Sequence, residues 1–157
     1  MGFSNGELRF FLGWAQEVAG DHAAARESWR QARSELEPFL KEQPENGRLI
    51  GDLALIYVGL GNKTAAFALA EQAVAVIPLE KDSVAGPPLI EILARVATQM
   101  EEPDRAITAL EKLISLPYAG PFSENVPLTP ALLRLDPMFD PLRGDPRFQE
   151  LCKDKQP

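Results

Sequence analysis

The stretch NGRLIGDLALIYVGLGNKTAAFALAEQAVAVIP, residues 46–78, decides the fold because it has every part of one helix–turn–helix unit. Four residues share one face of a first helix at helical spacing: Leu53, Ala54, Tyr57 and Leu60. Gly61 and Asn62 both tolerate the left-handed backbone that ends a helix, so they predict a turn. A second apolar stripe follows, at Ala66, Leu69, Ala70, Ala73 and Ile77. Pro78 then stops the second helix.

Length and composition limit the number of domains and the kinds of partner that we expect. A chain of 157 residues suits one domain with a sizeable core, and we expect a single domain over 1–157. The net charge of −7 and the lack of a Lys/Arg cluster disfavour a nucleic-acid partner, because binding phosphates requires clustered cations. The single cysteine fits a reducing compartment, and no apolar run reaches the roughly 20 residues of a membrane-spanning helix. We therefore expect a cytoplasmic domain that binds neither nucleic acid nor membrane.

Two further hairpins flank the first one, at residues 5–41 and 87–117. In the earlier hairpin, the packing stripe of the first helix is predicted at Leu8, Phe11, Leu12, Ala15 and Val18. Gly20 and Asp21 mark its turn, and Pro38 predicts a kink or a fresh turn in its second helix. In the later hairpin, Pro87 and Pro88 suit the first turn of a helix, and Glu101 stands where the other hairpins have glycine.

These hairpins resemble tetratricopeptide (TPR) repeats. The pattern of that family is matched by Leu53-Ala54, Tyr57, Gly61, Ala66, Ala73 and Pro78. It is matched in part by Leu12-Gly13, Gly20, Ala25 and Ala32 in the hairpin at 5–41. The turns recur about every 40 residues, against about 34 in a regular TPR. The resemblance implies an all-α fold: a right-handed α-α superhelix, or solenoid, of three irregular hairpins at about 5–41, 46–78 and 87–117.

Residues 128–153 are predicted to form C-terminal capping helices. Asp136, Asp140 and Asp145 each precede a proline, and we interpret them as helix caps because Asp accepts bonds from free amides at a helix start. A metal site made by the three carboxylates is the less favoured interpretation. The side chains expected to cover the last hairpin are Leu133, Leu135, Met138, Phe139, Leu142, Phe148 and Leu151.

The segment from Leu133 to Leu151 also resembles the end of TPR regions in larger bacterial signalling proteins. In those proteins an effector domain, such as a kinase, a nucleotide cyclase or a winged-helix regulator, precedes the TPR region. The resemblance implies the docking or sensor end of a signalling or regulatory protein. Two alternatives stay open, a fragment of such a protein and a short gene of its own.

Catalytic chemistry is not favoured. His22 is the only histidine and lacks a nearby nucleophile, although Asp21 could orient it. Lys153 and Lys155 could lower the pKa of Cys152, but a thiol without a role is the preferred interpretation. We expect no enzyme, no cofactor and no bound metal.

The first helix of each hairpin is expected to line a concave, partner-binding face. Pointing away from the packing stripes, the residues of this face are Glu7, Phe10, Trp14, Glu17, Arg48, Leu55, Glu91 and Arg95. Aromatic and arginine side chains are frequent anchors in interfaces, so a protein or peptide partner is expected. Phe10 and Trp14 are equally explained by contact with an upstream helix, with residues 118–130 or with a second copy of the chain.

Three functions follow, in order of preference. The first is a non-enzymatic protein–protein interaction scaffold. The second is a homo-oligomerisation element that pairs two copies as a homodimer through the N-terminal face. The third and remote one is a metal-dependent helical enzyme that uses Asp136, Asp140 and Asp145.

Overall fold

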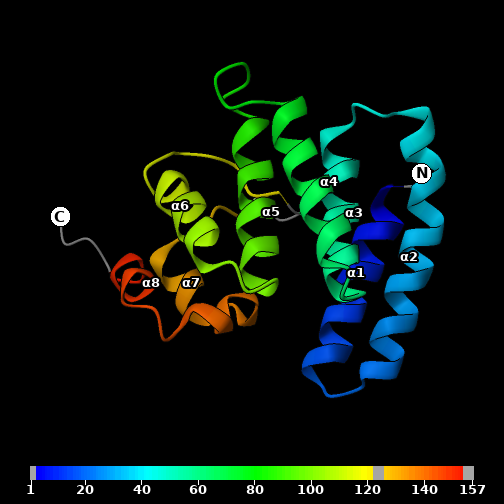
Figure 1. The fold of residues 1–157 in the computed structure, drawn as a ribbon, viewed down its shortest axis with the longest axis horizontal. Helices are drawn as coiled ribbons and strands as arrows, with labels where there is room; N and C mark the ends of the chain where they lie inside the picture. Colours follow the sequence, from blue (N-terminus) through cyan, green and yellow to red (C-terminus); the bar gives the residue numbers. More distant parts are fainter. Residues whose placement is uncertain (1–2, 122–125, 154–157) are drawn as a thin grey trace. The chain divides into compact units, whose positions relative to one another are not determined.

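A computed structural model describes residues 3–121 and 126–153. Within these ranges all regular secondary structure is helical and no strand occurs, as predicted (Figure 1). The chain divides into two compact units, residues 1–77 and 78–157, and each is described by itself.

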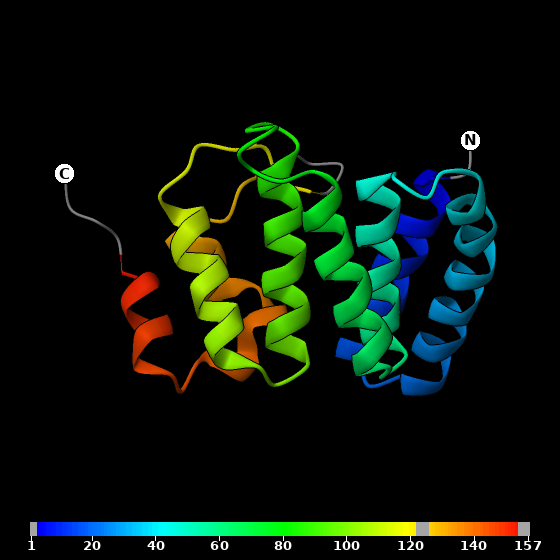
Figure 2. The same ribbon diagram turned by 45° about the horizontal axis from the view of Figure 1, so that its top comes forward.

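The first unit holds two helical hairpins. The first hairpin is α1 (Phe3–Val18) with α2 (His22–Glu42), and the second is α3 (Gly47–Gly59) with α4 (Lys63–Val76). Both helices of the first hairpin contact α3, and α4 packs on α3 as its partner (Figure 2). The helical hairpins predicted at 5–41 and 46–78 are therefore confirmed.

The second unit holds the third hairpin, α5 (Gly86–Gln99) with α6 (Pro103–Ile114). Three short elements follow it: α7 (Pro130–Leu135), the 3-10 helix η1 (Pro137–Leu142) and α8 (Pro146–Leu151). η1 contacts α5, and α8 contacts α6. Each of α5, α6, α7, η1 and α8 has a proline in its first turn, where a missing N–H costs nothing.

The three hairpins turn in the same way. Gly20, Gly61 and Glu101 have φ values of 84°, 73° and 60°. At each turn this left-handed residue donates its N–H three residues back, and the next residue donates five residues back. Both bonds define the Schellman motif, which satisfies carbonyl groups at the end of a helix. The alignment of positions 20, 61 and 101 from sequence is therefore confirmed in backbone geometry.

Side chains cap several of the helices. Asn46 accepts a hydrogen bond from the backbone N–H of Leu49, and Asn62 accepts one from Ala65. Asp136 accepts from the N–H of Met138, and Asp145 from that of Arg147, so two of the three Asp-Pro pairs are caps. Asp140 instead lies inside η1, and its carboxylate binds Arg143.

The predicted packing face of α1 is wrong. Leu8, Leu12 and Val18 are 65%, 49% and 60% exposed, whereas Phe10 is buried. The buried side of the helix also carries Gly13. A count of apolar residues favours the leucine stripe, but the glycine side admits the closer approach of α2, and that geometry decides the packing.

Trp29 explains this reversal. Its indole lies against Gly13 of α1 and Gly59 of α3, where an added Cβ would come within 2.5 Å of Nε1 and 2.2 Å of Cδ2, respectively. Its Nε1 donates to the backbone oxygen of Phe10 over 3.2 Å. One buried ring from α2 therefore joins both neighbouring helices.

Two further expectations need correction or completion. α2 continues through Pro38 to Glu42 instead of starting a fresh turn. Leu135, expected in the C-terminal core, is 75% exposed because it ends α7 on the side away from buried Leu133. The other predicted core residues of this segment are buried, except half-buried Leu151: Leu133, Met138, Phe139, Leu142 and Phe148.

The left-handed turn at Glu101 predicts a stabilising substitution. Glu101→Gly removes the steric cost that an L-residue has at φ 60°. It should stabilise the protein by about 1 kcal/mol, which raises the melting temperature by about 2–4 °C. Glu101→Gln is the control, since it removes the charge and keeps the Cβ. An equal rise in both variants, measured by calorimetry, would show that charge and not conformation limits this turn.

The contact between Trp29 and Gly13 predicts the opposite effect. Gly13→Ala should raise helix propensity by about 1 kcal/mol, yet the clash with the indole should give a net loss of about 1–3 kcal/mol. In a Trp29→Phe background the same change should cost less, which a double-mutant cycle from urea unfolding measures. Gly144→Ala, in open space, is the control. Additive effects of the two changes would contradict the contact.

Candidate functional site

The most concentrated group of buried polar side chains lies on α5 in the second unit. Glu91 and Arg95 are one helical turn apart and both are buried, on a helix whose other buried residues are mostly apolar. Leu89, Ile92 and Val96 anchor α5 in the core, so the helix presents its two charges at a fixed position. An ionised pair in such surroundings must be fully hydrogen-bonded to be tolerated.

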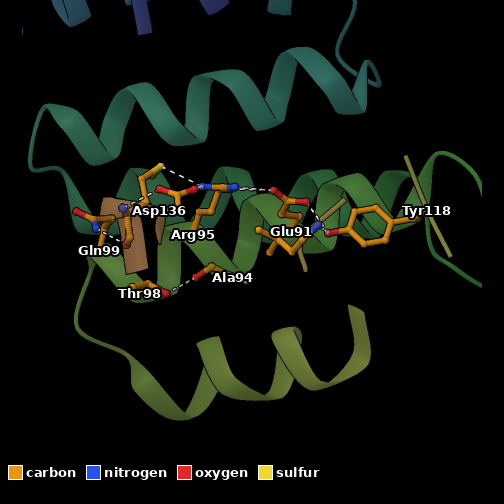
Figure 3. A network of polar contacts seen from close by, with 9 residues as sticks. Glu91, Ala94, Arg95, Thr98, Gln99, Tyr118 and Asp136 are labelled. Atoms are coloured by element: carbon orange, nitrogen blue, oxygen red, sulfur yellow. Dashed lines mark hydrogen bonds and ion pairs between the residues drawn. The ribbon is translucent and has the colours of Figure 1, made fainter. Parts of the chain in front are cut away.

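Arg95 lies between two carboxylates (Figure 3). Its Nε and Nη2 donate to one oxygen of Glu91 over 3.0 and 2.8 Å. Its Nη1 donates to Oδ2 of Asp136 over 2.7 Å, and its guanidinium lies 5.0 Å from the centre of the Phe139 ring. Burial alone lowers the pKa of Arg95, but the two carboxylates outweigh it and raise the pKa. The guanidinium is thus the positive centre of this network.

Tyr118 binds the second carboxylate oxygen of Glu91. Its hydroxyl donates to Oε2 of Glu91 over 2.6 Å and accepts the backbone N–H of Leu128 over 2.8 Å (Figure 3). Burial raises the pKa of this phenol, and the nearby Glu91 carboxylate raises it further. Tyr118 therefore stays neutral and acts as a hydrogen-bond donor, which ties both ends of the segment from 118 to 128 to α5.

The amide of Gln99 completes the attachment of η1. Its Nε2 donates to the backbone oxygen of Met138 over 2.6 Å. Together with Arg95, it holds the first turn of η1 against α5, while Asp136 also caps that turn. Arg95 thus binds the carboxylate of Asp136 and covers the ring of Phe139, while Gln99 binds a main-chain carbonyl. In this structure both side chains bind the chain's own C-terminal segment.

The predicted partner-binding residues differ in how exposed they are to solvent. Phe10, Leu55, Glu91 and Arg95 are buried. Trp14 and Glu17 are half-buried, and Arg48 is exposed. Glu7 belongs to α1, but its side chain lies outside the described part of the structure. Glu91 and Arg95 are the two brought together; Tyr118 binds Glu91 and Asp136 binds Arg95, so the α5 part of the predicted face is filled.

The sequence missed Tyr118 and the second role of Asp136. The pairing of Arg95 with Glu91 could have been predicted, because opposite charges one turn apart in an apolar helix indicate a buried ion pair. No comparable pattern connects Arg95 with Asp136, which lies 41 residues further along the chain.

His22 and Cys152 are the remaining candidates for chemistry. His22 is exposed and contacts Glu17, not Asp21. Partial burial raises the pKa of Cys152, and the nearby Arg134 and Arg143 only reduce that shift, so the lowering that neighbouring lysines could have caused does not occur. Lys155 lies outside the described residues.

The second unit also has a cleft, and the carboxylates considered as metal ligands lie near arginines. A cleft of about 660 Å³ in the second unit is lined by Glu111, Ile114, Ser115, Pro130, Glu150, Leu151 and Lys153. Within residues 3–121 and 126–153, no three His, Cys, Asp or Glu side chains lie close enough together to hold a metal ion. Each carboxylate of the proposed Asp trio contacts an arginine instead: Asp136 with Arg95, Asp140 with Arg143 and Asp145 with Arg147. None of the described helices combines the length and apolar character that crossing a membrane requires.

Breaking the network should destabilise the second unit. Arg95→Met leaves Glu91 buried without its cation, and such a loss costs about 3–5 kcal/mol. We expect earlier urea unfolding of residues 86–153, followed through their amide signals by NMR. Arg147→Met is the matched control: it also removes an arginine bound to two carboxylates, Asp104 and Asp145, but on the surface, where little should change. Equal effects of both substitutions would refute a special role for the buried network.

Comparison with known proteins gives no relative: no family model, no curated protein and no solved structure matches this chain.

Proposed function

We propose that the chain is a non-enzymatic, TPR-like interaction module that binds a protein or peptide partner. In this proposal its hairpins stack as a right-handed α-α superhelix closed by the C-terminal segment. Given the resemblance of residues 133–151, it is the docking or sensor end of a bacterial signalling or regulatory protein in the cytoplasm.

The observation that carries the proposal is the repeated turn. Gly20, Gly61 and Glu101 share a left-handed backbone and the same pair of hydrogen bonds. A repeat of one supersecondary unit supports a stacked array, because each hairpin alone cannot bury its apolar face. Such arrays expose a continuous surface and use it for binding.

Burial narrows the surface on which a partner would bind. The α5 face is occupied by the chain's own residues, and α3 is buried along nearly its whole length. On these first helices the predicted residues that reach solvent are Arg48, Trp14 and Glu17. We therefore place partner binding on α1 and the start of α3.

A second candidate is homo-oligomerisation through the N-terminal face. The exposed side chains of Leu8, Leu12 and Val18 favour it, because a monomer rarely exposes so much apolar surface on one helix. Phe10, which the sequence assigned to this interface, is buried within the first unit and does not contribute.

A peptide-binding experiment tests the first candidate. Peptides selected from a displayed random library should shift amide NMR signals of α1 and the start of α3. Arg48→Glu should weaken their binding at least about tenfold, because an arginine in an interface commonly contributes more than 1 kcal/mol. Arg26→Glu, on the exposed side of α2, is the matched control. Failure to enrich any peptide, or shifts confined to α2 and α4, would reject the proposed face.

A further inference from the structure

We draw no further inference here: the strongest candidate, the exposed apolar stripe of Leu8, Leu12 and Val18 on α1, carries none because nothing in the structure shows what covers it.

Discussion

A helical hairpin forms only where the chain can reverse within a few residues, and this requirement shapes all three hairpins of the protein. Each reversal uses a single left-handed residue whose N–H and following N–H satisfy the last carbonyls of the helix. The two helices of a hairpin then run back along each other and can pack together. Gly20 and Gly61 meet the requirement without strain, whereas Glu101 meets it against its own steric preference.

Within the second unit, one cation organises the packing of segments that are distant in sequence. Arg95 binds Glu91 on its own helix and Asp136 on the C-terminal segment, and Tyr118 binds the remaining oxygen of Glu91. Buried charges are tolerated when every partner is present, and here three segments supply the partners. The network therefore requires the C-terminal segment to lie at one place on α5.

In the first unit, α1 has two faces that could both pack, and glycine decides between them. On the glycine side, the ring of Trp29 of α2 packs so close to Gly13 that a Cβ at that position would clash with it. The leucine side stays exposed although it is the more apolar one. Close approach of a large ring, with its hydrogen bond to a main-chain oxygen, gains more contact than a stripe of leucines that meets no partner in its unit.

The sequence alone determined the all-helical class, the three hairpins, their turns and most of the caps, because these depend on interactions within a few residues. It also predicted most of the C-terminal core, since Phe139 and Phe148 have few alternatives to burial. Only the tertiary structure decided which face of α1 packs and that Arg95 binds Asp136 instead of solvent. Both outcomes depend on contacts between residues far apart in the chain, where shape and desolvation act together and no local pattern records the partner.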